Sequence, residues 1–358
     1  MQQKSLTGRS NSGSSAPSAN GSLTHNLVQL TKLGFGLGIL VLLFVWVDLE
    51  SLLRVFYRLG PAAISILFLI YTSDRLVMAY KWYLLVKSRQ VEVRYWTLVR
   101  AYYYSALLGP FVPATVGGDA IRFLVVRREP ISSEVLVSSM IVEKLLGFLA
   151  MLIMAAGAVI WLFVELGASG IIRGLAVAVL VGIAGTVAVV RVFFFEIKIT
   201  SFARRLLEKL GKSLSANIKL VREIVNAFLR DTKTISTFLL LSLIEQAIPP
   251  IFMFALASVL VDEVSFIGVF CVTLLTLLIS RIPISIGGIG VQEGAFVGLF
   301  LLIGLSKEQA LAISLAARMC EFIFPLPILF ADFGGVIRFF RQARRGRGAI
   351  LKPNESLR

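Results

Sequence analysis

Long apolar runs constrain the fold of this 358-residue chain more than any other feature. The runs are Val28–Val47, Ala62–Tyr80, Val135–Val164, Gly174–Val190, Thr237–Val261, Phe266–Ile279 and Ala310–Phe330. Several reach the roughly 20 residues that a helix needs to cross a bilayer. Charged residues make up only 16% of the chain, against about 25% in a typical soluble domain. The sequence therefore predicts an all-α, polytopic membrane protein.

The net charge of +15 does not indicate a nucleic-acid partner in so apolar a chain, whose mean hydropathy is +0.85. An excess of Lys and Arg is typical of cytoplasmic loops and of surfaces that face anionic lipids. We expect membrane lipids as partners and no nucleic acid. The single His25 precedes the first run, and Cys271 and Cys320 lie within apolar runs. We therefore expect no metal, no cofactor and no enzymatic centre.

Basic segments predict the orientation in a plasma membrane. The positive-inside rule places three of them in the cytoplasm, at 81–100, 198–233 and the C-terminal tail at 341–358. The polar 1–26 stretch is typical of a disordered cytosolic tail, so both termini are expected inside, flanking a transmembrane domain at 27–340. The 198–233 connection is basic and amphipathic, as in a helix on the inner leaflet or a solvated connecting helix.

This orientation predicts six full spans and two re-entrant hairpins. The spans are expected near 28–48, 61–81, 136–165, 172–195, 234–261 and 306–335. The segments 98–124 and 264–304 then begin and end on the same side, so they read as hairpins entering from the cytosol and from outside. If they cross instead, the chain has eight or more spans.

Two related strings mark the hairpins: Pro113-Ala-Thr-Val-Gly-Gly118 and Pro283-Ile-Ser-Ile-Gly-Gly288, 170 positions apart. Helix-breaking segments in matching halves are the best sequence pointer to a transporter's substrate site. We expect repeat units at about 61–165 and 233–335, the second inverted. Two further matches support the repeat: Arg75 with Glu245, and Lys144 with Arg318.

Ionisable residues within membrane segments are candidate functional residues, because each costs about 2.5–3.5 kcal/mol to insert. The proposed substrate-binding set is Gly117, Gly118, Asp119, Arg122, Glu143, Lys144, Arg281, Gly287, Gly288, Glu293 and Arg318; a supporting charge network comprises Asp74, Arg75, Glu245 and Glu321. Exposed glycine amides beside an arginine are suited to a phosphate. The alternative is that these charges pair only to hold helices together.

The motifs resemble the flippase-like family that contains the lysylphosphatidylglycerol synthase transmembrane region, the membrane domain of multiple peptide resistance factors. The resemblance rests on Pro113-Ala-Thr-Val-Gly-Gly-Asp-Ala-Ile-Arg122, on Glu143-Lys144, and on Pro283-Ile-Ser-Ile-Gly-Gly-Ile-Gly-Val-Gln-Glu293, and covers about 30–340. It implies a domain that moves a phospholipid or lipid-linked headgroup between leaflets, with both hairpins forming the site. We expect no synthase activity, because nothing after residue 340 is long enough for the soluble synthase domain.

The leading hypothesis is a lipid translocase that works by alternating access. Arg122 and Arg281 would bind an anionic headgroup, while Asp119, Glu143 and Glu293 would balance charge or bind a cationic moiety. A partner enzyme would make the transported lipid. The alternatives are a membrane-embedded enzyme that modifies lipids or glycans, or a subunit of one, and a small-solute transporter.

Overall fold

A computed structural model describes residues 49–109, 117–194, 212–281 and 291–332. The predicted tails at 1–26 and 341–358 and the predicted span at 28–48 lie outside these residues. The chain divides into two compact units, Met1–Ser51 and Leu52–Arg358, and the contacts described below belong to the second. Every regular element in the described ranges is helical, as the sequence predicts.

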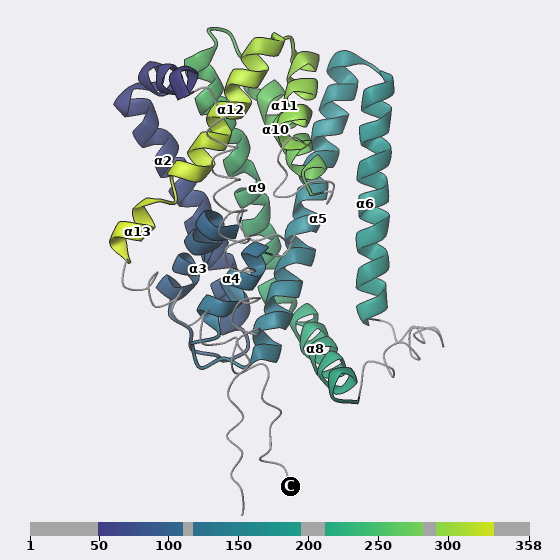
Figure 1. The fold of residues 1–358 in the computed structure, drawn as a ribbon. Coiled ribbons are helices and arrows are strands. Elements are labelled where there is room, and N and C mark those ends of the chain that lie inside the picture. Colours follow the sequence, from purple (N-terminus) through teal and green to yellow (C-terminus); the bar gives the residue numbers. More distant parts are fainter. Residues whose placement is uncertain (1–48, 110–116, 195–211, 282–290, 333–358) are drawn as a thin grey trace, which may run out of the picture. The chain divides into compact units, whose positions relative to one another are not determined.

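Four helices are long and apolar enough to cross a membrane in the part of the chain that the structure describes. They are α2 (Leu49–Lys87), α5 (Ser133–Leu166), α6 (Gly170–Phe194) and α9 (Thr232–Leu260) (Figure 1). They correspond to the spans expected near 61–81, 136–165, 172–195 and 234–261, which confirms those four as long apolar helices. Within α2 the apolar segment starts at Leu59, because Gly60 leaves helical geometry with φ 65° and Pro61 follows it.

Each predicted hairpin segment contains two short helices that pack against each other. The first holds α3 (Tyr95–Leu108) and α4 (Gly117–Val126), and the second holds α10 (Phe266–Ile279) and α11 (Val291–Phe300), which a short 3-10 turn at Leu301–Ile303 extends. Residues 113–116 of the first string and the whole of the second string, with Gly287 and Gly288, lie outside the described residues, whereas Gly117 and Gly118 begin α4. At 14 or 10 residues, each of these helices is too short to span a bilayer as a single straight helix.

The span expected at 306–335 is not one continuous helix. Helix α12 runs over Lys307–Ile323 and stops; a turn follows, and α13 (Pro327–Ala331) begins after it. The interruption coincides with Pro325 and Pro327, since proline lacks an N–H donor and disfavours helical geometry in the residue before it. A capping box at Ser306 and Gln309 defines the start of α12.

The described part of the basic connection is helix α8 (Lys212–Arg230), and part of its apolar surface packs against protein. Val225 and Phe228 are fully buried in a cluster with Leu85, Val142 and Phe238, from α2, α5 and α9. Arg89 anchors the C-terminal end of α8, because its guanidinium donates to the Ala227 carbonyl at 2.9 Å. Helix α8 therefore packs on the ends of the long helices. Leu220 on the same helix stays 44% exposed.

The largest core cluster joins all the long apolar helices and both hairpin pairs. Helix α5 is central to it, with contacts to α6, α8, α9 and α10. Large apolar side chains that stay exposed, such as Ile160, Val164, Leu180 and Val181, lie on α5 and α6. In a membrane protein this exposed apolar surface is the expected contact with lipid tails.

Candidate functional site

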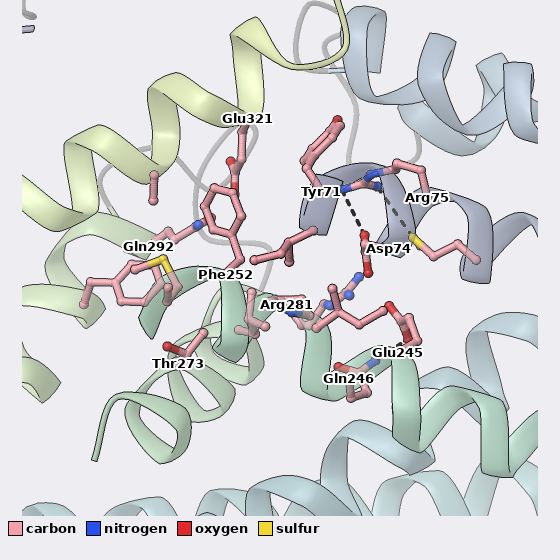
Figure 2. A pocket seen from close by; sticks show the side chains of 18 residues that line it. Tyr71, Asp74, Arg75, Glu245, Gln246, Phe252, Thr273, Arg281, Gln292 and Glu321 are labelled. Carbon is pink, nitrogen blue, oxygen red and sulfur yellow. Dashed lines mark hydrogen bonds and ion pairs between the residues drawn. The ribbon is translucent and has the colours of Figure 1, made fainter. Parts of the chain in front are cut away.

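A cavity of about 190 Å³ lies among α2, α9, α10, α11 and α12. Figure 2 shows charged side chains from these different helices turned into it. Its described lining is Ile70, Tyr71, Asp74, Arg75, Met78, Glu245, Gln246, Ile248, Pro249, Phe252, Met253, Thr273, Leu277, Arg281, Gln292, Phe296, Ala317 and Glu321. The lining combines two bases and three acids with aromatic and aliphatic walls, the composition of a site for an amphipathic ligand.

The α2 wall carries buried polar atoms that have no hydrogen-bond partner. These atoms are the Tyr71 hydroxyl, Asp74 Oδ1 and Arg75 Nε. The adjacent groups make only long contacts: Arg75 Nη2 lies 3.5 Å from Asp74 Oδ2, and Arg75 Nη1 lies 3.5 Å from the Met78 sulfur. A buried polar atom without a partner costs about 1–3 kcal/mol. Three such atoms on successive turns of one helix mark a place where a ligand or water completes the bonding.

The α9 wall contributes backbone acceptors because of two consecutive prolines. Pro249 and Pro250 lie inside α9, and neither has the N–H that would donate to the carbonyl four residues earlier. Those carbonyls belong to Glu245 and Gln246, whose side chains line the cavity. Backbone groups freed at membrane depth are tolerated where they line a polar cavity. The paired prolines thus make this wall rich in acceptors.

A buried lysine that is absent from the predicted site residues neutralises the glutamate in this wall. Lys81 Nζ on α2 lies 3.0 Å from Glu245 Oε2 and 3.2 Å from Ser242 Oγ. Gln246 donates to the same Glu245 oxygen at 3.2 Å. Lys81 lies at the polar end of an apolar run, so the positive-inside rule assigns it to a cytoplasmic segment. Its position in the helix does indicate a role at the cavity, because Lys81 follows Asp74 by seven positions, about two helical turns, and so lies on the same face of α2.

The residues around the first hairpin form a separate charge network. Arg122 on α4 donates to both oxygens of Glu143, at 2.7 and 3.0 Å, and to Asp119 Oδ1 at 2.6 Å. Tyr102 donates to Glu143 at 2.5 Å, and Lys144 donates to Asp119 Oδ2. Arg122 is 5% exposed, and its described contacts are with protein groups. Its predicted role in headgroup binding stays a prediction, because Arg122 is not among the described residues that line the cavity.

The first hairpin network rests on a fully buried tryptophan. Arg122 lies over the Trp82 ring at 5.2 Å and over the Tyr102 ring at 4.7 Å. Trp82 in turn donates from its indole nitrogen to Ser139 at 3.0 Å. The network therefore links α4 to α2, α3 and α5. Its member on α2, Trp82, follows Lys81, which bonds the cavity residue Glu245.

The second hairpin has its own network, which reaches the cavity. Arg318 on α12 donates to Glu293 at 2.7 Å, to Glu321 at 3.1 Å and to Gln292 at 3.1 Å. Gln292 and Glu321 also line the cavity. The predicted residues thus separate into groups, with Asp74, Arg75, Glu245, Arg281 and Glu321 around the cavity and the two hairpin networks beside it.

Glycines matter where the arms of the first hairpin meet. Gly117 and Gly118 begin α4, and a Cβ on Gly118 would lie 2.6 Å from the Ser105 hydroxyl oxygen on α3. A Cβ on Gly109 would lie 3.3 Å from the Gly118 Cα. These glycines therefore permit close approach of the two arms.

The charged groups in and beside the cavity balance, with four bases against four acids. Lys81 pairs with Glu245, and Arg318 pairs with Glu321 and Glu293. Asp74 then faces both Arg75 and Arg281, and Figure 2 shows the Arg281 side chain directed toward Asp74 and Glu245. In the described residues no group of three or more His, Cys, Asp or Glu side chains is placed to hold a metal ion. The cavity therefore offers a ligand both guanidinium donors and carboxylate acceptors.

Comparisons with known proteins agree with a membrane role. A family model described as the lysylphosphatidylglycerol synthase TM region matches residues 30–328. A UPF0104 membrane protein of Pyrococcus horikoshii is 21% identical over 314 residues, which cover 81% of this chain and 92% of that protein. No solved structure matches the chain.

Proposed function

The chain belongs to the lysylphosphatidylglycerol synthase transmembrane-region family, and from this premise we propose that it moves a lipid with a charged headgroup between the leaflets of a membrane. The cavity among α2, α9, α10, α11 and α12 is the proposed headgroup site. The lipid tails would stay in the bilayer along the exposed apolar helix surfaces.

The observation that carries this proposal is the set of unpartnered polar atoms on α2. The Tyr71 hydroxyl, Asp74 Oδ1 and Arg75 Nε are buried and face a cavity that already contains Arg281. A charge network that only held helices together would satisfy its own members, as the first hairpin network does. The α2 groups are arranged instead to receive an external partner.

The headgroup chemistry follows from which groups are available. Arg75 and Arg281 suit a phosphate, because guanidinium groups bind oxyanions through charge-assisted, often bidentate bonds. Asp74 Oδ1 and the carbonyls released by Pro249 and Pro250 accept hydrogen bonds, which suits a hydroxyl or ammonium group on the same headgroup. A phospholipid with an anionic or zwitterionic headgroup meets both requirements.

An inverted repeat would let this site open to each leaflet in turn. The order of helices supports it, since a long helix, two short helices and another helix occur twice, at 59–166 and at 232–323. The paired short helices have equal lengths in the two halves, 14 and 10 residues. We propose that the short pairs are re-entrant hairpins from opposite sides, and that the halves rock about the cavity.

The proposed location is the plasma membrane with both termini in the cytoplasm. The concentration of Lys and Arg at 81–100 and in α8 supports this orientation. An enzyme that makes the transported lipid would be a natural partner.

Leaflet transfer in reconstituted vesicles tests the function. Vesicles of phosphatidylethanolamine and phosphatidylglycerol would carry traces of acyl-labelled forms of each, and an impermeant quencher would report how much label reaches the outer leaflet. We expect transfer by the wild type and strong loss in Arg281→Gln and Asp74→Asn, with Arg127→Gln as a matched control because Arg127 is exposed and outside the cavity lining.

The same assay can overturn the proposal. Equal transfer by wild type, Arg281→Gln and Asp74→Asn would remove the cavity as the headgroup site. Chemical conversion of either probe lipid, detected by mass spectrometry, would favour the membrane-embedded enzyme instead. Transport of a soluble ion or solute without lipid transfer would favour the small-solute transporter.

A further inference from the structure

Two ion pairs occupy the same place in the two halves of the chain. In the first half, Asp119 is the third residue of α4, and it accepts from Lys144, the twelfth residue of α5. In the second half, Glu293 is the third residue of α11, and Arg318, the twelfth residue of α12, is one of the residues with which it interacts, donating to it at 2.7 Å. The partners are 25 residues apart in both pairs.

The positions of the charged residues in their helices agree between the two halves, although the two strings have a different spacing from the charged residues. The Gly-Gly pairs of the two strings are 170 positions apart, but the two acids and the two bases are each 174 apart. The spacing between the two acids therefore exceeds the spacing between the two Gly-Gly pairs by four residues, which is about one helical turn. In both halves the acid is the third residue of the second short helix, and its partner is the basic residue at position twelve of the following helix. The equivalence belongs to the folded helices and was not visible from the strings alone.

The second pair contacts the cavity lining directly, whereas the first pair is linked to it through several residues. Arg318 also bonds Gln292 and Glu321, which line the cavity. Asp119 also bonds Arg122, which lies over Trp82. The residue before Trp82 is Lys81, which bonds the cavity residue Glu245. Each pair fastens the second arm of one hairpin to the following helix. Breaking one pair removes one of the contacts that hold that arm to the following helix, and it leaves the pair in the other half intact; α4 keeps the Arg122–Glu143 bonds to α5, and α11 keeps the Gln292–Arg318 bond to α12.

We propose that the Asp119–Lys144 and Glu293–Arg318 pairs are the two gates of the cavity, one for each side of the membrane. Release of one pair lets its hairpin arm move and admits water or lipid from that side, while the other pair stays closed. Lys144 and Arg318 thus act as positioning residues, which do not touch the headgroup themselves. This inference rests on the proposed function, because gates are needed only if the cavity serves both leaflets.

The two gates differ in exposure in this structure. The side chain of Lys144 is 53% exposed, whereas that of Arg318 is 12% exposed. An exposed ion pair contributes little to stability, whereas a buried one is costly to break from one side. The Asp119–Lys144 gate is therefore the one that opens first from this conformation.

Side-specific labelling of a reporter cysteine tests the gates without using lipid transfer. The native cysteines would be replaced by Cys271→Ser and Cys320→Ala, and Thr273→Cys would place a thiol in the cavity lining. An impermeant maleimide would be added to right-side-out or inside-out membranes. We expect Lys144→Met to raise the labelling rate from the cytoplasmic side only, and Arg318→Met to raise it from the opposite side only.

Controls separate gating from damage to the fold. Lys307→Met removes an exposed lysine from α12 and should leave both labelling rates unchanged. Lys144→Arg keeps the charge and should retain wild-type rates. If Arg318→Met does not fold, Glu293→Gln tests the same gate from its acidic side.

The outcomes distinguish the gates from the proposed function. Faster labelling from opposite sides of the membrane in Lys144→Met and Arg318→Met supports the gates. If this result is obtained but the wild type transfers no lipid, the gates are supported and the translocase function is excluded. Equal changes from both sides, changes from the same side in both variants, or no change would each overturn the gates. If Arg281→Gln loses lipid transfer but neither Lys144→Met nor Arg318→Met changes the labelling rate from one side only, the proposed lipid-transfer function is supported and the gates are excluded.

Discussion

Lys81 Nζ on α2 lies 3.0 Å from Glu245 Oε2 on α9, and their side chains are only 5% and 9% exposed. The two residues are 164 positions apart in the chain. Their ion pair joins the first long helix of one half to the first long helix of the other, directly beside the cavity. Because burial removes both charges from water, each depends on the other for compensation.

Lys81→Met should strongly destabilise the protein. Methionine keeps the length of the side chain but leaves the Glu245 carboxylate buried without its cation, next to the acidic Asp74. Removal of one partner of a buried ion pair costs about 3–5 kcal/mol. Chemical denaturation in mixed micelles measures this loss.

The double variant Lys81→Met/Glu245→Gln is the matched control for this prediction. Replacement of both charges removes the uncompensated carboxylate and should recover most of the lost free energy of unfolding. A double variant as unstable as Lys81→Met alone would mean that the loss comes from packing and not from charge.

Ala317→Leu should weaken lipid transfer by filling the cavity. Ala317 is 4% exposed and lines the cavity from α12. Overpacking costs about 1–3 kcal/mol, which corresponds to at least about fivefold weaker binding of the headgroup. Ala312→Leu, on the same helix but outside the cavity lining, should transfer lipid normally. Equal transfer by both variants in the vesicle assay would contradict the assignment of the cavity.

Gly109→Ala should loosen the first hairpin, whereas Gly147→Ala should not. A Cβ on Gly109 would lie 3.3 Å from the Gly118 Cα and 3.5 Å from its nitrogen, so backbone must move. We expect a loss of about 1–3 kcal/mol. A Cβ on Gly147 would have no neighbouring atom within 4 Å, and alanine in a helix interior gains about 0.5–1 kcal/mol over glycine. Melting temperatures of the two variants in detergent should shift in opposite directions.

Asp231, just before α9, should make the stability depend on acidic pH. Its carboxylate caps the helix by accepting from the Thr234 N–H at 3.2 Å, and hydrogen bonds from Thr234 lower the pKa of Asp231. The stabilisation is complete above the ordinary aspartate pKa of about 3.9. It is lost as the pH falls through the lower pKa of the folded state.

Asp231→Asn provides the comparison, because asparagine caps a helix nearly as well but does not titrate. Any advantage of the wild type in melting temperature should shrink as the pH is lowered below about 4. Asp231→Ala should lose about 0.5–2 kcal/mol at neutral pH. A constant difference between wild type and Asp231→Asn across this range would argue that the cap does not depend on charge.

The sequence alone predicted the helical class and the long helices well. An apolar run of sufficient length is a local property, because membrane insertion requires internally bonded backbone and apolar side chains in the same segment. Helices α2, α5, α6 and α9 follow from this requirement. The two pairs of short helices also fall in the predicted hairpin segments. The run at 306–335 was a harder case, because two prolines divide a stretch whose hydropathy alone looks continuous.

The sequence also selected the right kind of residue for the site, but it could not sort those residues into groups. Arg122 and Arg281 look alike in sequence, since each follows or precedes a Gly-Gly string. In the folded chain Arg122 is bound by Asp119 and Glu143, whereas Arg281 lines the cavity. Lys81 was not selected at all, although it neutralises Glu245.

The amino-acid sequence by itself determined that this chain forms membrane-spanning helices and that charged side chains would be buried among them. Only the tertiary structure decided which charges pair and which stay open to a cavity, including the pairing of Asp119 with Lys144 and of Glu293 with Arg318. The physical reason is that helix length depends on neighbouring residues in the chain. Pairing depends on the rotation and packing of helices whose partners are as far apart as Lys81 and Glu245.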